Sequence, residues 1–432
     1  MEKNRIKRSL RVSFWDGVFA SGMMGFTTDY FTPYAIALKA QISQVGLLNA
    51  LPIFISSVLQ LKSADLTEKI KSRKKVVLVF IMAHIISGIP LIFIPYLPGA
   101  WRVGALIIFV SLFVSLNGFA GPVWLSLMSD YLPPKKRGKY FGWRNKILGI
   151  IGLCCTFMAG IILHLSKRDI LFGFILIFAI AIICRIISWY YLTLMYETPF
   201  RLDKNAYFTF WEFIRRARES NFVKFVLFVS SLSFSVYLAS PFFSVFMLKD
   251  LKFGYITYTV LIATVSLISI VMIDRWGRHA DKIGNLKILR VTSVFIALLP
   301  ILWLFNHHPV YLVFVQMVSG FAWSGFNLCA INFIYDAAGP AKRTRCIAYY
   351  NFCNGLAICL GSLAGGFLIK YLPVLWGYKL LSLFLLSGIC RFIAVSLLFP
   401  KVREVRRVEK VAGWDLFFSV IGVRSMSGAT EE

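Results

Sequence analysis

The sequence predicts an all-α, polytopic membrane protein with twelve transmembrane helices, arranged as two parallel repeats of six. Of its 432 residues, 58% are hydrophobic, and the mean hydropathy is +0.72. Apolar runs of about 18 or more residues recur along the whole chain, and such a run can cross a hydrocarbon core of about 30 Å. These runs do not alternate between apolar and polar residues, as the strands of a membrane β-barrel would. An internal repeat gives the arrangement of the spans.

The repeat is clearest in a basic loop between two apolar runs. Asp130 recurs as Asp336, after a shift of 206 residues. Arg185 recurs as Arg391 at the same shift. The shift also relates Pro134 to Pro340, Lys136-Arg137 to Lys342-Arg343, Asn145 to Asn351 and Gly149 to Gly355. Because each half then holds six spans that run in the same direction, the halves are parallel repeats, related by an axis along the membrane normal.

The apolar runs place the spans and the domains. The expected spans are 12–38, 43–61, 76–96, 103–128, 143–165, 170–194, 222–248, 254–275, 288–306, 310–334, 346–370 and 375–399. Prolines inside them are expected to kink the helices rather than end them. The first half is 1–195 and the second half is 222–400. Between them, 196–221 is expected to be a cytoplasmic linker with an amphipathic helix, and 401–432 a basic, amphipathic cytoplasmic tail.

The distribution of basic residues predicts the orientation. If the N-terminus, alternate loops and the C-terminus face the cytoplasm, that side holds 37 of the 47 Lys and Arg residues, and the opposite loops hold seven. This asymmetry predicts that both termini are cytoplasmic and that the number of spans is even. The net charge of +27 therefore reflects topology rather than a nucleic-acid partner. We expect a multi-pass protein of the inner membrane of a prokaryote.

Several kinds of chemistry find no motif in the sequence. The eight cysteines lie in or at the ends of apolar runs, without Cys-x-x-Cys spacing, so neither a metal site nor a disulfide framework is predicted. A phosphate-binding Gly-x-x-x-x-Gly-Lys-Ser/Thr loop is also missing. We therefore expect no cofactor and no enzymatic activity.

One loop carries the motif of a known family. Segment 277–285 reads Gly-Arg-His-Ala-Asp-Lys-Ile-Gly-Asn and is followed by Lys287, whereas the first half keeps only Ala64-Asp65 at the corresponding place. The second-half segment resembles the Gly-x-Leu-Ala-Asp-Arg/Lys-x-Gly-Arg-Arg/Lys loop of the major facilitator superfamily. The resemblance extends over 12–399. It implies a twelve-helix fold and secondary transport by alternating access.

The same loops are expected to form a cytoplasmic gate. An Asp at a helix end can accept hydrogen bonds from a helix N-terminus or pair with an Arg of a neighbouring helix. The expected pairs are Asp130 with Arg137 and Arg144, and Asp336 with Arg343 and Arg345. The expected gate residues are Asp65, Asp130, Arg137, Arg144, Asp281, Asp336 and Arg343. The alternative is that the basic residues only mark topology.

Ionisable residues within the spans are the next candidates, because charges at membrane depth are costly and mark functional positions. Asp29 lies roughly 25 Å along the first span by helix rise. It has no acidic counterpart in the second half, where Tyr237 occupies the matching place. We expect Asp29 to couple transport to protons or to bind the solute, the alternative being a hydrated carboxylate near the outer mouth. Arg185 and Arg391 obey the repeat, so a shared structural role is expected of them.

In the superfamily, the first, fourth, seventh and tenth spans line the cavity. The resemblance therefore implies a set of polar and aromatic cavity residues: Asp29, Tyr30, Asn117, Trp124, Tyr237, Trp323, Asn327 and Asn332. The predicted function is secondary active transport of a small solute, coupled to protons, by a monomer in the lipid bilayer. The alternative is a membrane scaffold or sensor that keeps the fold and moves no solute.

Overall fold

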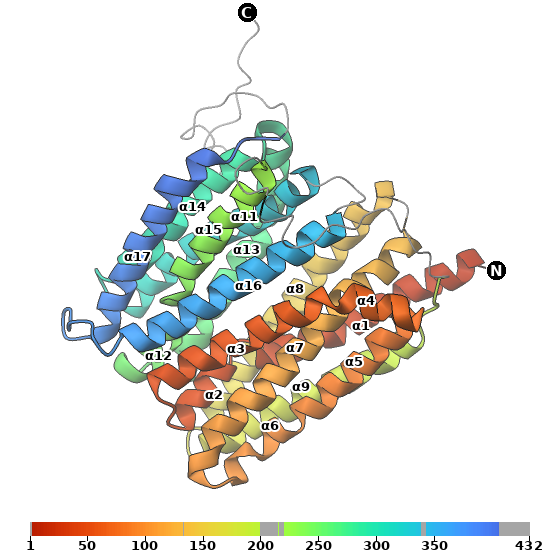
Figure 1. The fold of residues 1–432 in the computed structure, drawn as a ribbon. Helices are drawn as coiled ribbons and strands as arrows, with labels where there is room; N and C mark the ends of the chain where they lie inside the picture. The colour runs from red at the N-terminus through yellow and green to blue at the C-terminus, as the bar shows by residue number, and fades with distance from the viewer. Residues whose placement is uncertain (1, 133, 199–214, 216–219, 338–342, 406–432) are drawn as a thin grey trace, which may run out of the picture.

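A computed structural model of the chain describes residues 2–132, 134–198, 215, 220–337 and 343–405. This part is almost entirely helical, with a single isolated bridge, between Leu375 and Tyr378, as its only β-structure. Its helices form two elongated groups that lie side by side, drawn from red to yellow and from green to blue in Figure 1. The predicted amphipathic helix in 196–221 and the amphipathic tail lie mainly outside the described residues.

The first half contains the helices before the linker. They are α1 (Glu2–Thr27), α2 (Phe31–Ala37), α3 (Ile42–Leu61), α4 (Ser63–Ile70), α5 (Arg73–Gly88), α6 (Pro90–Phe93), η1 (Ile94–Tyr96), α7 (Gly99–Tyr131), α8 (Pro134–Leu165) and α9 (Ile170–Thr193).

The second half repeats this order. Its helices are α11 (Asn221–Tyr237), α12 (Ser240–Val245), the π-helical η3 (Phe246–Asp250), α13 (Tyr255–Ile283), α14 (Asn285–Leu302), α15 (Pro309–Ala337), α16 (Arg343–Leu368), α17 (Lys379–Leu398) and η4 (Phe399–Lys401).

Eleven helical segments of the described residues are long and apolar enough to cross a membrane. The segment missing from this set is the first expected span, which is divided into α1 and α2. Pro33 has no N–H to donate to the carbonyl of Asp29, four residues earlier, so the helix cannot run unbroken through this point. Pro241 interrupts the seventh span in the same way, after α11. The expectation that every membrane proline only kinks its helix is therefore wrong at these two positions and at Pro90, where α5 ends and α6 begins, whereas Pro52 and Pro122 do lie inside helices.

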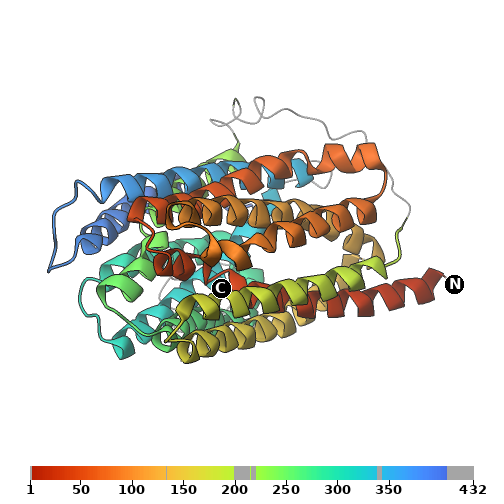
Figure 2. The same ribbon diagram turned by 90° about the horizontal axis from the view of Figure 1, so that it is seen from below.

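The halves contact each other mainly along two pairs of helices, and α12 also packs against α2 and α3. The light-blue α16 runs beside the orange-red α3 in both views, and α8 packs against α13 (Figures 1 and 2). We call the end of the molecule with α2 and α12 the α2 end, and the end with α4 and the start of α1 the α4 end.

The hydrophobic core distinguishes these two ends. One cluster of buried side chains draws on both halves, with Tyr34 and Phe174 from the first half and Phe246 and Trp303 from the second. The two other clusters take their buried residues from one half each. The shared cluster contains the residues of α2 and α12, so the halves are packed together at the α2 end.

The loop motif of the second half forms a sharp turn. α13 continues to Ile283 and α14 begins at Asn285, so Gly284 alone joins them, with φ of +87°. Glycine adopts this region without steric cost. In the first half the corresponding turn is made by Lys71, at φ +57°. The first-half loop therefore turns without the glycines of the motif.

Candidate functional site

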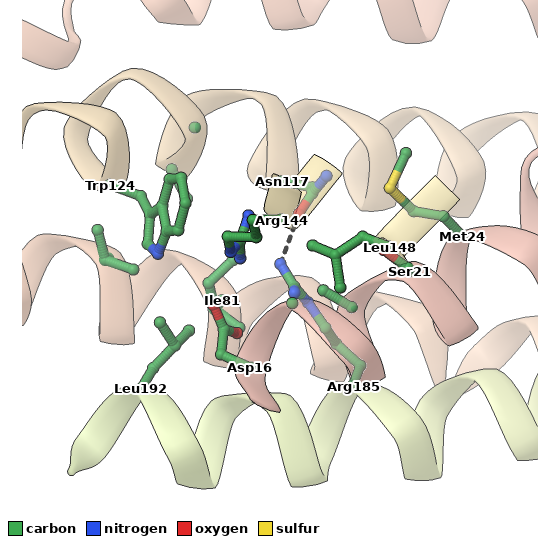
Figure 3. A pocket seen from close by; sticks show the side chains of 15 residues that line it. Asp16, Ser21, Met24, Ile81, Asn117, Trp124, Arg144, Leu148, Arg185 and Leu192 are labelled. Carbon is green, nitrogen blue, oxygen red and sulfur yellow. Dashed lines mark hydrogen bonds between the residues drawn. The ribbon is translucent and has the colours of Figure 1, made fainter. Parts of the chain in front are cut away.

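A cavity of about 240 Å³ lies inside the first half, between α1, α5, α7, α8 and α9. Most of its lining is apolar, but Asp16, Arg144 and Arg185 also face it, together with Asn117 and Trp124 (Figure 3). The three ionisable side chains are only 4–7% exposed. Buried ionisable groups at membrane depth are costly, so this cluster is the first candidate for a functional site.

Arg185 of α9 links the polar residues of the cavity. Its Nη2 donates to Oδ1 of Asn117 at 2.6 Å, the bond drawn in Figure 3. Its Nη1 donates to Oγ of Ser188 at 3.1 Å. The Ser188 hydroxyl in turn donates to Oδ1 of Asp16 at 2.7 Å. Asp16 and Arg185 are therefore joined through a serine, and no direct ion pair is present between them.

Arg144 enters the cavity from α8. Its Nη2 donates to the backbone carbonyl of Ser13 at 3.0 Å, and its guanidinium lies over the ring of Trp124, 4.8 Å from the ring centre. Such a contact between a cation and an aromatic face is favourable where water is excluded. The sequence placed Arg144 at the gate because 143–165 was expected to be the span. α8 begins at Pro134 instead, so Arg144 lies well inside a helix.

The second half holds a larger cavity of about 470 Å³. Three residues predicted to face the solute, Tyr237, Trp323 and Asn327, line it. Its other polar groups are mainly serines and amides, and its one charged lining residue is Arg391. This cavity offers uncharged hydrogen-bonding groups.

Arg185 and Arg391 occupy the same place in the repeat but have different partners. Arg391 donates to Ser387 Oγ and to the backbone carbonyls of Ile296 and Val236, over distances of 2.9–3.3 Å. These bonds tie α17 to α14 and α11, which fits the expected structural role. Arg185 instead contacts two side chains, Ser188 and Asn117, and Asn117 lines the first cavity. Repeat symmetry therefore predicted the fold correctly but missed this difference in surroundings.

The other predicted solute residues lie outside both cavities. Tyr30 is fully buried, and its hydroxyl contacts the backbone carbonyl of Thr156 at 2.6 Å and Thr259 Oγ1, in the second half, at 3.0 Å. The Asp29 side chain is exposed at the break between α1 and α2. The Asp29 carbonyl, which Pro33 leaves free, accepts from Tyr258 Oη of the second half at 2.7 Å. Asn332 is half-buried on α15 and lines neither cavity.

The predicted gate residue Asp130 has a partner that the sequence did not identify. Oδ2 of Asp130 accepts from Arg73 at 2.5 Å and from Thr198 Oγ1 at 2.9 Å. The expected pairing of Asp130 with Arg144 is therefore wrong, because Arg144 points into the cavity. The side chain of Arg137 lies outside the described part of the chain.

The second half repeats this arrangement with different residue types. Oδ2 of Asp336 accepts from Asn285, the first residue of α14, at 2.7 Å. Glu404 accepts from the backbone N–H of Leu286 at 2.7 Å, as Glu197 accepts from that of Lys74 at 3.2 Å. These glutamates were not among the predicted gate residues, although 207 residues separate them, nearly the shift of the repeat.

The remaining gate predictions are tested less directly. Asp65 is exposed in the first turn of α4, and Asp281 lies in the last turn of α13. The side chains of Arg343 and Arg345 are outside the described residues. Across the halves at the α4 end, Lys146 Nζ pairs with Asp274 at 3.0 Å, and both side chains are exposed. Within the described ranges, no group of three or more His, Cys, Asp or Glu side chains could hold a metal ion.

Comparisons with known proteins agree with this architecture. The family model described as Major Facilitator Superfamily matches residues 15–305 and 225–426. A protein of Buchnera aphidicola subsp. Schizaphis graminum, described as an uncharacterized transporter, is 23% identical over 202 residues. That match covers 44% of this chain and 48% of the relative, so it spans about half of the relative's length.

Solved transporter structures share the fold at low sequence identity. The nucleoside transporter NupG is 13% identical, with a TM-score of 0.66 over 92% of this chain and 99% of its own. A bacterial homologue of the human lysosomal transporter Spinster, in an inward-facing and unoccupied conformation, is 12% identical, with a TM-score of 0.69 over 92% and 97%. An auto-inhibited peptide transporter of the POT family is 11% identical, with a TM-score of 0.70 over 94% and 98%.

Proposed function

The chain belongs to the major facilitator superfamily, and we propose that it moves a small solute across the membrane by alternating access. It is an integral, multi-pass membrane protein and a transporter of this superfamily's type. Alternating access requires two bundles that rock against each other around a site between their ends. The finer proposals below concern the cycle, the orientation, the gate and the source of energy.

One observation carries the proposal of alternating access. Among the described residues, buried side chains of both halves mix only in the cluster at the α2 end, while the clusters toward the α4 end take their buried residues from one half each. Hydrogen bonds across the halves at the α2 end join Tyr30 to Thr259 and Tyr258 to the Asp29 carbonyl. Such contacts can break and re-form as the halves rock, so this conformation represents the state closed at the α2 end.

The orientation follows from the basic loops. We place the α4 end in the cytoplasm, because the N-terminus and the loops that hold most Lys and Arg residues belong to it. This orientation puts both termini in the cytoplasm. We further propose that the protein is a monomer in the inner membrane of a prokaryote. In this orientation the present conformation faces inward.

The gate proposal uses the contacts at the α4 end. Arg73 with Asp130, and Asn285 with Asp336, fasten the third span of each half to the fourth. These bonds lie within a half and hold the ends of the helices that must meet when the α4 end closes. Asp65, Asp281, Arg137 and Arg343 complete the proposed gate.

For the energy source, we propose a proton gradient coupled through Asp29. This carboxylate is exposed at the break in the first span, next to contacts that must open. A side chain in that position can contact water on one side of the membrane in one state and water on the other side in the next state. Asp29→Asn is expected to abolish accumulation driven by a proton gradient and to preserve exchange of solute across vesicles at equal pH. Unchanged accumulation would remove Asp29 from this role.

The decisive measurement is transport by the purified protein in lipid vesicles, scanned over solute classes with and without a proton gradient. Movement of a solute that saturates, and that Tyr30→Phe alters, is the expected result. If no solute moves under any gradient while the protein binds another protein through 401–432, transport is refuted in favour of a scaffold or sensor.

A further inference from the structure

We propose that the cavity of the first half binds the carboxylate of a small, monoanionic organic solute. This inference rests on the proposed function, since it names the class of solute that would be carried. It goes beyond that function by assigning recognition to Arg144 and Arg185.

The charge of the cavity is unbalanced. Arg144, Arg185 and Asp16 are its ionisable lining residues, so it carries two positive charges and one negative charge. Neither arginine forms an ion pair within 4 Å with a carboxylate of the described residues. Buried charges are normally paired, because an unpaired charge in a low-dielectric site is costly. A single bound anion would bring the cluster to neutrality.

The donors that could hold this anion are unused. A guanidinium carries five N–H donors, of which Arg185 directs two to protein partners and Arg144 one. The Nε atoms of both residues are buried without a partner, and so is Nε1 of Trp124. An arginine fork matches the geometry of a carboxylate, to which it can donate two parallel bonds. The arginines come from neighbouring helices and converge on one cavity (Figure 3).

Size and polarity narrow the solute further. A volume of about 240 Å³ is below the roughly 300–1,000 Å³ of pockets for drug-sized ligands. Beside the charged cluster, the lining is apolar: Ala20, Met24, Val77, Ile81, Ala120, Leu148 and Leu192. This combination fits a short apolar body with one carboxylate. A dianion such as phosphate would leave excess negative charge in the same space.

The second cavity makes the assignment specific to the first half. Its arginine, Arg391, is held by two backbone carbonyls and Ser387, and these partners occupy each of its three nitrogens. No acidic residue occurs in α11, where a counterpart of Asp16 would lie. The repeat supplies an arginine to both halves, but of these two only Arg185 has a buried Nε without a partner.

Binding can be measured without transport. The purified protein in detergent is heated with butyrate, butyramide, butylamine, succinate or inorganic phosphate, and the unfolding midpoint is recorded. A ligand that binds only the folded state stabilises it by RT ln(1 + [L]/Kd), so at equal concentration the tighter ligand raises this midpoint more. We expect butyrate to stabilise the protein, and butyramide, butylamine and phosphate to have at least 10-fold weaker effects in apparent Kd. Equal stabilisation by butyramide or by phosphate would overturn the carboxylate assignment.

Matched variants locate the effect. Arg185→Gln should weaken butyrate binding at least 10-fold, with partial rescue in Arg185→Lys. Arg168→Gln, which removes the same charge from an exposed position between α8 and α9, should bind as the parent does. Butyrate binding that survives Arg185→Gln would overturn the proposal.

Two further variants test the charge balance without removing an arginine. Asn117→Asp has nearly the same shape and places a carboxylate against Arg185, so butyrate binding should be lost while the fold is kept. Asp16→Asn raises the net charge by one and should improve succinate binding relative to butyrate. The charge balance would be refuted if Asn117→Asp still bound butyrate as the parent does and Asp16→Asn kept the parent's ratio of succinate to butyrate binding.

The outcome can be separated from that of the proposed function. Butyrate binding without transport would leave this site standing and refute secondary transport. Transport of neutral or cationic solutes that is insensitive to Arg185→Gln would support secondary transport and refute this site.

Discussion

The closure at the α2 end gives the sharpest prediction. We expect the double variant Tyr30→Phe/Tyr258→Phe to shift the protein toward a state open at that end. It removes the hydroxyls that bond to Thr259 Oγ1 and to the Asp29 carbonyl in the opposite half. Both rings stay in place, so their edge-to-face contact, at 6.4 Å between centres, is kept. The variant therefore changes hydrogen bonding and leaves apolar packing almost unaltered.

The magnitude follows from the number of bonds lost across the halves. A net hydrogen bond contributes about 1 kcal/mol in water-soluble proteins and about 0.6 kcal/mol between membrane helices. Two bonds then amount to about 1.2–2 kcal/mol. Because about 1.4 kcal/mol corresponds to a factor of ten, the ratio of open to closed states should rise roughly 7- to 30-fold.

Pulsed electron paramagnetic resonance measures this shift. Spin labels at Lys39 and Lys252, exposed turn residues of opposite halves at the α2 end, report the distance between the halves, with the native cysteines replaced. The expected result is a larger population at long distance. Tyr34→Phe is the control, since its equally buried hydroxyl donates to Leu91 within the first half. An unchanged distribution in the double variant, or an equal shift in the control, would refute the reasoning.

Two further predictions concern stability, measured as the unfolding midpoint in detergent. A Cβ at Gly320 would lie 2.5 Å from the Val265 carbonyl, so Gly320→Ala should destabilise by about 1–3 kcal/mol, whereas Gly104→Ala, with open space around it, should be neutral or stabilising. A similar loss at both glycines would contradict the packing. Arg73→Gln should lower the free energy of unfolding more than Lys146→Gln does, because the Arg73 side chain is only 6% exposed in its pair with Asp130. Lys146 and Asp274 are both exposed, and such a pair contributes about 0–1 kcal/mol. Equal midpoints for these two variants would show that burial does not decide the strength of the pairs.

The candidate site was only partly predictable, and the reasons are physical. Asn117 and Trp124, which the family pattern assigns to the cavity through the fourth span, do line the cavity of the first half, while their role toward a solute stays a prediction. Arg144 was assigned to the gate, since sequence alone does not show that α8 starts ten residues before it. Asp16 was not predicted to face a cavity, because its hydrogen-bond partner, Ser188, lies on a helix far away in the sequence.

The sequence by itself determined the class of fold. Long apolar runs must be helices in a bilayer, where every backbone group has to bond within its own segment, and the shift of 206 residues makes the halves parallel repeats. These properties depend on local composition and on order along the chain.

Only the tertiary structure decided which charges meet. Repeat symmetry made Arg185 and Arg391 look equivalent, and each donates to a serine, yet packing gives Arg391 two backbone carbonyls and gives Arg185 the amide of Asn117. Side-chain partners depend on how separate helices pack, and the two halves pack different residues around the same position. That difference in neighbours separates a structural arginine from a proposed solute site.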